Sequence, residues 1–227
     1  MERRLAKRIV IRDNSNEKSE ECKSMEYCLF RHGETNWNVK GIIKSHMDDT
    51  GTYFTQTGLA QIKCITKLLQ NSGIQAVFSS DLYRTAETAK HVCGVLQLPL
   101  FFSARFRGMN MGAFHGKPIE EFLRHEEVRN AFIDYDYPIP GGESINQLRE
   151  RLCSALKDIR DNYSYDKVLV VTHGAAISNV VSYVNHSPYQ DVDYCYLKLD
   201  AESFHVGVTG RYDELLAGSE ATSLPEL

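Results

Sequence analysis

Three short apolar runs in this chain are followed at once by side chains that can attack or bind a phosphate group. These side chains are Arg31 and His32 after residues 27–30, Arg84 shortly after residues 76–79, and His173 after residues 168–172. A neutral imidazole can attack phosphorus and form a phosphohistidine. Guanidinium groups and a second, protonated imidazole can hold the phosphoryl oxygens while their charge grows. The residue types therefore indicate phosphoryl transfer, with no metal ion or other cofactor required.

The apolar runs alternate with helical patterns, which predicts an α/β three-layer sandwich with a mostly parallel central sheet. Strands are predicted over residues 27–31, 76–79, 98–102, 168–172, 195–199 and 204–208, and helices over about 56–69, 82–96, 145–159 and 175–184. A charged helical excursion is expected over about 118–132. In such folds ligands bind beyond the carboxyl ends of the strands, where helix N-termini also favour anions. We therefore expect the three strand ends to meet at one anion-binding cleft.

Taken singly, each of these residues has a simpler explanation. A lone His-Gly at a strand end is usually part of a turn, and an arginine on a helix usually forms a surface ion pair. The simpler explanation is accepted for His46, His91, His125, His186 and His205. Lys44 is likewise expected to be a solvated loop charge, with contact to a second phosphate as the alternative. What sets the four residues at the strand ends apart is their joint pattern.

Five segments of the chain, in order, resemble the histidine phosphatase superfamily, which includes phosphoglycerate mutases and fructose-2,6-bisphosphatases. The segments are Arg31-His32-Gly33-Glu34-Thr35 with Trp37-Asn38, Thr55-Gln56-Thr57-Gly58 with Gln61, residues 79–89, Pro140-Gly141-Gly142-Glu143-Ser144, and Val170-Val171-Thr172-His173-Gly174. The resemblance covers about residues 27–199. It implies a phosphoglycerate mutase-like fold and a small phosphorylated metabolite as the substrate.

The resemblance also implies roles for individual residues. His32 would be the nucleophile, Arg31, Arg84 and His173 would surround the phosphate, and Asn38 would contact it. One segment departs from the family, whose members commonly carry Leu-Arg-Glu with the Glu as proton donor. The matching stretch here begins Phe106-Arg107-Gly108, so Gly108 stands where the acid is expected. His115 stands where the Gly-x-x-Glu-Gly segment that follows in the family has its Glu.

Gly108 leaves the general acid unassigned. General acid help is typically worth about 10²–10⁴ in rate, and an alkyl phosphate needs it most. One explanation is that His115, Glu34, Glu143 or a carboxylate from residues 117–136 supplies the proton. A second is that the substrate has a good leaving group, such as an acyl phosphate or a pyrophosphate. A third is that the protein is catalytically weak and binds phosphorylated ligands.

These observations lead to one principal function and two alternatives. A phosphatase acting through phosphohistidine is preferred, because the 117–136 excursion is short and cofactor-dependent mutases tend to carry a longer insertion there. A cofactor-dependent phosphoglycerate mutase is the nearest alternative. A regulatory protein that binds phosphorylated ligands is the alternative from another class, motivated by Gly108.

Composition bounds the remaining possibilities. The chain has 227 residues and 42% apolar content, which favours one domain, expected over residues 25–210. Residues 1–24 are expected to be a disordered extension without a secretory signal, and residues 211–227 a tail.

The net charge of -4 does not suggest a nucleic-acid or membrane surface. The six cysteines show no disulfide or CxxC pattern, so a reduced, cytoplasmic protein is expected. The oligomeric state is left open.

Overall fold

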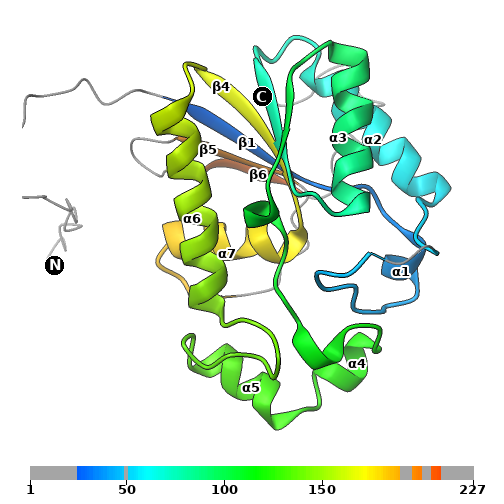
Figure 1. Ribbon diagram of the computed structural model, residues 1–227, viewed down its shortest axis with the longest axis vertical. Coiled ribbons are helices and arrows are strands. Elements are labelled where there is room, and N and C mark those ends of the chain that lie inside the picture. The colour runs from blue at the N-terminus through cyan, green and yellow to red at the C-terminus, as the bar shows by residue number, and fades with distance from the viewer. Residues whose placement is uncertain (1–24, 49–50, 190–195, 201–205, 211–227) are drawn as a thin grey trace, which may run out of the picture.

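The computed structural model describes residues 25–48, 51–189, 196–200 and 206–210. Its centre is a six-stranded sheet in the order β3-β2-β4-β1-β5-β6 (Figure 1). The strands are β1 (Glu26–Arg31), β2 (Ala76–Ser79), β3 (Leu100–Phe102), β4 (Lys167–Thr172), β5 (Tyr196–Asp200) and β6 (Val206–Gly210). The first four strands of that order are parallel, and β5 and β6 pair antiparallel at one edge.

The central strands bury side chains on both faces, which explains their continuous apolar sequences. Along β1, Tyr27 and Leu29 enter one core, whereas Cys28 and Phe30 enter the other. The apolar residues of β4 divide between the two cores in the same alternating way. This two-sided burial confirms the prediction that residues 168–172 form a central parallel strand.

Helices cover both faces of the sheet and complete three layers (Figure 1). The four long helices are α2 (Gln56–Leu69), α3 (Tyr83–Leu96), α6 (Ile145–Asn162) and α7 (Gly174–Val184). Ile65 of α2 and Val92 of α3 pack into the same core as Phe30. Leu148 of α6 and Ile177 of α7 pack into the core on the opposite face. The predicted α/β sandwich is therefore confirmed.

Side-chain caps mark the starts of α2 and α6 at the residues that the sequence suggests. Thr55 precedes α2, and its hydroxyl accepts the backbone N–H of Gly58 at 3.0 Å. Ser144 precedes α6 and forms a capping box with Gln147. Each cap satisfies backbone N–H groups that have no partner inside the helix. The short helix α1 (Asn36–Val39) begins with a capping box of its own.

The segment between β3 and α6 is less regular than the sequence predicts. It contains two 3₁₀ turns, η1 (Ala104–Phe106) and η2 (Gly112–Phe114), and two short helices, α4 (Ile119–Phe122) and α5 (Glu126–Ile133). The single helical excursion expected over 118–132 is thus divided in two. Phe114 and Phe122 meet edge to face with 5.1 Å between ring centroids, which anchors the segment on the core.

Several expectations concern other parts of the chain. Residues 1–24 and 211–227, with Cys22, Cys195 and His205, lie outside the described residues. Within the described part, Cys28, Cys64, Cys93 and Cys153 form no disulfide. None of the helices in that part has the length and apolar character needed to cross a membrane.

Candidate active site

The carboxyl ends of three parallel strands meet at one edge of the sheet. Arg31 at the end of β1 is in register with Thr172 at the end of β4, and Ser79 of β2 is in register with Val171. The backbone N–H of His32 continues this pairing to the carbonyl of Thr172 at 3.1 Å. The residues that follow the strands are therefore brought together by the register alone.

His32 and His173 form the centre of this edge. Their ring centroids lie 5.3 Å apart, with 66° between the ring planes, and each residue is about 95% buried. The Nδ1 atom of His32 lies 2.8 Å from the carbonyl oxygen of Gly33. A carbonyl only accepts, so Nδ1 carries the hydrogen and Nε2 keeps a lone pair. The Nε2 atom of His173 lies 3.2 Å from the hydroxyl of Ser80.

Two arginines complete what we call the histidine–arginine cluster, namely Arg31, His32, Arg84 and His173. Arg84 is buried in the first turn of α3 and donates from Nη2 to the carbonyl of Ser45 at 3.0 Å. The Arg31 side chain passes over the start of α7, since a Cβ on Gly174 would lie 3.6 Å from its Cδ atom. All four residues singled out at the strand ends are thus gathered at one edge.

The cluster lowers the basicity of both imidazoles. Burial, followed by the charges of Arg84 and Arg31, holds the pKa of His32 well below its usual range. Burial, followed by the charge of Arg84 and then those of His32 and His46, does the same to the pKa of His173. Desolvation and nearby positive charge both disfavour an imidazolium. Both rings are therefore neutral at neutral pH when no anion is bound, and His32 can act as a nucleophile.

Asn38 and Glu34 are held by neighbouring backbone and side-chain groups. The Asn38 amide oxygen accepts from the backbone N–H and the hydroxyl of Thr35, at 2.9 and 2.8 Å, at the start of α1. Glu34 accepts a 2.5 Å hydrogen bond from the hydroxyl of Thr55 at the start of α2. These contacts stabilise the loop that follows His32, and they use the Glu34 carboxylate as an acceptor.

His115 and Lys44 lie together beside Trp37. The His115 ring stacks on Trp37 with centroids 6.2 Å apart, and its Nδ1 lies 2.7 Å from the carbonyl of Lys44. The Lys44 ammonium lies 4.2 Å from the Trp37 ring centroid and donates to the hydroxyl of Thr52. Lys44 is buried, so the expectation of a solvated loop charge is wrong. Its long side chain is instead held by an aromatic face and a hydroxyl group.

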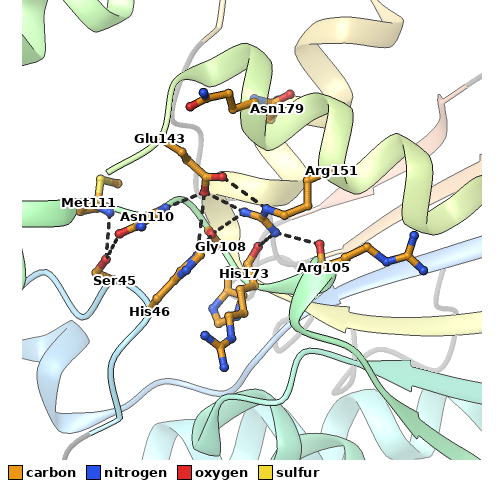
Figure 2. A network of polar contacts seen from close by, with 12 residues as sticks. Ser45, His46, Arg105, Gly108, Asn110, Met111, Glu143, Arg151, His173 and Asn179 are labelled. Carbon is orange, nitrogen blue, oxygen red and sulfur yellow. Dashed lines mark hydrogen bonds and ion pairs between the residues drawn. The ribbon is translucent and has the colours of Figure 1, made fainter. Parts of the chain in front are cut away.

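Glu143 forms part of a polar network around Gly108 (Figure 2). Its Oε1 atom accepts the Arg151 Nη2 at 2.7 Å and the backbone N–H of Asn110 at 2.7 Å. Arg151 in turn donates to the backbone carbonyls of residues 105, 107 and 108, at 2.8 to 3.0 Å. Glu143 is therefore used to hold Arg151 and the loop.

The carboxylates of the 117–136 excursion are the remaining candidates for the general acid. Glu121 pairs with Lys117, and the other carboxylates of the excursion are exposed.

His46 is the residue that sequence reasoning missed. Its Nε2 atom lies 2.6 Å from the carbonyl oxygen of Gly108 and 3.8 Å from Glu143 (Figure 2). The expectation of an ordinary surface histidine fails, because its side chain is only 23% exposed. It belongs to the irregular 41–54 loop. That loop has no apolar periodicity from which the buried side chains could be predicted. The contacts of His46 with Gly108 and Glu143, which are distant in the sequence, are the signal that only the fold supplies.

The family assignment follows from the match of the whole domain. The model of the histidine phosphatase superfamily, branch 1, matches residues 27–211. The chain belongs to this superfamily. It is 32% identical over 161 residues to the "Probable phosphoglycerate mutase GpmB" of Yersinia pestis (strain Pestoides F), covering 70% of this chain and 74% of the relative. The resemblance inferred from the five ordered segments is thereby confirmed.

Solved structures of the superfamily share the same architecture. A phosphoglycerate mutase from Bacillus anthracis str. Sterne matches with a TM-score of 0.75 and 18% identity, over 89% of this chain and all of that one. The alpha-ribazole phosphatase from Shigella flexneri matches with a TM-score of 0.68 and 23% identity, over 83% and 97% of the two chains. Mutases and phosphatases thus share this fold, and the fold alone does not distinguish them.

Proposed function

We propose that this protein hydrolyses a small phosphomonoester through a phosphohistidine formed on Nε2 of His32. The observation that carries the proposal is the contact between the buried rings of His32 and His173, which Arg31 and Arg84 flank. The Gly33 carbonyl orients the ring so that the lone pair of His32 lies on Nε2. The lowered pKa of His32 keeps that lone pair available.

The remaining members of the cluster act on the phosphate itself. Arg31 and Arg84 bind the phosphoryl oxygens, and the N-terminus of α7 beside Arg31 adds partial positive charge. A bound phosphate brings negative charge next to His173, which raises the pKa of its imidazole and favours the protonated form. His173 then stabilises the charge that develops on the transferring group. Asn38 is assigned a phosphate contact on the family pattern.

A phosphatase is preferred to a mutase on the size of the segment between β3 and α6. That segment contains only two short helices, α4 and α5, whereas a mutase must keep water away from a bisphosphate. The names of relatives support the mutase as the second candidate. We assign no cofactor and no metal ion to the phosphatase reaction. A small phosphorylated metabolite is the partner, and the cytoplasm is the proposed location.

Formation of a phosphoenzyme tests the proposal directly. Purified protein is mixed with p-nitrophenyl phosphate, quenched, and analysed for a phosphoryl group that is stable in alkali and labile in acid. We expect this group on the wild-type protein and none on His32→Asn, together with loss of phosphate release. Circular dichroism of the variant controls for folding. Phosphoryl transfer that survives in His32→Asn would refute the mechanism.

The same protein preparation separates the alternatives. With 3-phosphoglycerate and a trace of 2,3-bisphosphoglycerate, ³¹P NMR distinguishes isomerised product from inorganic phosphate. Release of phosphate without isomerisation supports the phosphatase, and isomerisation without release supports the mutase. Calorimetric binding of phosphoglycerates without either reaction would identify a binding protein.

A further inference from the structure

We propose that His46 donates the proton to the leaving-group oxygen when His32 attacks phosphorus, and takes a proton from water when the phosphohistidine is hydrolysed. The inference rests on the proposed function, because it names the proton donor of that reaction. Hydrolysis of an alkyl phosphate needs such a group, and the Gly108 position provides no side chain.

The position of His46 is the first argument. Its Nε2 atom contacts the carbonyl of Gly108 at 2.6 Å, and Gly108 lies against His173, since a Cβ there would be 2.9 Å from the His173 Cβ. Figure 2 shows His46 and His173 next to Gly108. The chain on either side of His46 is tied to Arg84, through the carbonyl of Ser45 at 3.0 Å and Asp48 at 3.5 Å. The imidazole of His46 is therefore held at the border of the histidine–arginine cluster.

The conformation of the loop is the second argument. Ser45 has a left-handed backbone with φ of 47°, which is strained for a residue other than glycine. Its hydroxyl accepts the backbone N–H of Met111 at 2.8 Å and donates to the Asn110 side chain at 3.3 Å. Asp48 also accepts the backbone N–H of Tyr83 at 2.6 Å, at the start of α3. These contacts hold the turn that directs His46 toward Gly108.

The hydrogen bond to Gly108 also determines which nitrogen of His46 exchanges protons. A carbonyl oxygen cannot donate, so Nε2 keeps its hydrogen in both charge states of the ring. Protons are therefore gained and lost at Nδ1. Anchoring one ring nitrogen in this way orients the imidazole and selects its tautomer.

The groups around His46 act on its pKa in opposite directions. Burial is the main influence and lowers the pKa of His46, and the charges of Arg151 and Arg107 act in the same direction. The Gly108 carbonyl and Glu143 act in the opposite direction and raise it. Other titratable groups facing it are His173 and Asp81. A phosphate bound nearby adds negative charge, which raises the pKa and favours the proton-donating form.

Both proposed steps balance. In the first, a bond forms between His32 Nε2 and phosphorus, the ester P–O bond breaks, and the leaving oxygen takes the proton from Nδ1 of His46. In the second, Nδ1 accepts a proton from water while the water oxygen attacks phosphorus and the P–N bond breaks. His46 returns to its protonated form, and His32 returns to a neutral imidazole.

The other candidates for proton donor are already engaged. Both Glu143 oxygens accept from Arg151, and the backbone of Asn110 adds a further donor. Glu34 accepts from Thr55, and His115 stacks on Trp37. Arg151 also contacts the Gly108 carbonyl, but a guanidinium does not release its proton. Among the described residues, His46 is the partly exposed imidazole in direct contact with residue 108.

A leaving-group comparison tests the assignment with the full chain and its variants. In His46→Gln, the amide can still donate to the Gly108 carbonyl but has no proton to release. Single-turnover formation of phospho-His32 is measured with glycerol 2-phosphate, whose alkoxide needs a proton, and with p-nitrophenyl phosphate, whose phenolate needs little help. We expect His46→Gln to slow the first reaction by about 10²–10⁴ and the second by less than about fivefold. The exposed His91→Asn serves as the control and should change neither.

The outcomes separate the two proposals. An equal loss with both substrates, or no loss with either, would overturn the role of His46. A selective loss in His115→Gln with none in His46→Gln would assign the donor to His115 instead. The role of His46 would also be overturned if the wild-type protein is phosphorylated by p-nitrophenyl phosphate and never by the alkyl ester. Absence of phosphohistidine with both substrates would mean that the proposed function itself fails.

Discussion

Gly108 lies so close to His173 that a Cβ on residue 108 would be 2.9 Å from the His173 Cβ and 3.0 Å from its Cγ. These atoms are near the backbone of His173, so they cannot move away as the end of a flexible side chain could. Glycine at 108 therefore lets the loop after η1 lie against His173 at the edge of the sheet. Its carbonyl remains available to Arg151 and His46.

Gly108→Ala is expected to displace His173 and reduce activity. Overpacking of this kind typically costs about 1–3 kcal/mol of stability. Gly51→Ala is the matched control, because a Cβ there meets nothing within 4 Å and should change stability by less than about 0.5 kcal/mol. Urea unfolding and phosphate release measure the two effects. Gly108→Glu should suffer the same displacement, so an increase in its activity would contradict this account.

Gly58 and Gly94 should respond oppositely to alanine, although both lie inside long helices. A Cβ on Gly58 would lie 2.0 Å from the carbonyl oxygen of Glu34, so Gly58→Ala must separate α2 from the loop after His32. A Cβ on Gly94 meets nothing within 4 Å. Gly94→Ala should therefore stabilise the protein by about 0.5–1 kcal/mol, the usual gain in a helix.

Chemical denaturation measures this contrast. Gly58→Ala should lower the free energy of unfolding by several times the gain from Gly94→Ala. A gain in stability for Gly58→Ala would show that the loop does not pack on α2 as described.

The stability of the protein should fall as the pH is lowered from 7 to 5. The pKa values of His32, His173 and His46 are lowered in the folded state, each chiefly by burial. Below about pH 6.5 the unfolded chain binds protons that the folded protein does not, so their contribution is present above that pH and is lost as the pH falls. Each such histidine can contribute a slope of up to about 1.4 kcal/mol per pH unit.

Urea unfolding at several pH values measures this slope. The lowered pKa of Asp81 affects stability only at a lower pH than the histidines do, because the unfolded pKa of an aspartate is about 3.9. His173→Asn should reduce the slope between pH 7 and 5. A slope unchanged by that substitution would contradict the assignment.

Anion binding should take up protons. Sulfate keeps two negative charges across this pH range, and its charge beside His173 and His32 should raise their pKa values. We therefore expect sulfate to bind more tightly at pH 5.5 than at pH 7.5, with proton uptake visible by calorimetry in buffers of different ionisation enthalpy. Arg84→Ala should weaken binding at both pH values. Proton release on binding would refute this coupling.

Local patterns in the sequence were sufficient for the fold and the centre of the site. The continuous apolar run 168–172 predicted a strand buried on both faces, and Ser144 predicted the start of α6. His32 and His173 could be paired from the sequence because parallel strands place their carboxyl ends at one edge. These inferences rest on periodicity and on residues close in the chain.

The surroundings of the site depend on contacts between segments far apart in the chain. His46 and Gly108 are 62 residues apart, and Glu143 joins them from the loop before α6. No periodic pattern in the 41–54 loop could show that His46 turns inward while Met47 stays exposed. The sequence by itself determined which residues form the histidine–arginine cluster, because they lie at or soon after the ends of regular strands. Only the tertiary structure decided which ionisable side chain lies next to Gly108, the position where the family pattern has its acid. The packing of irregular loops sets the place of that side chain.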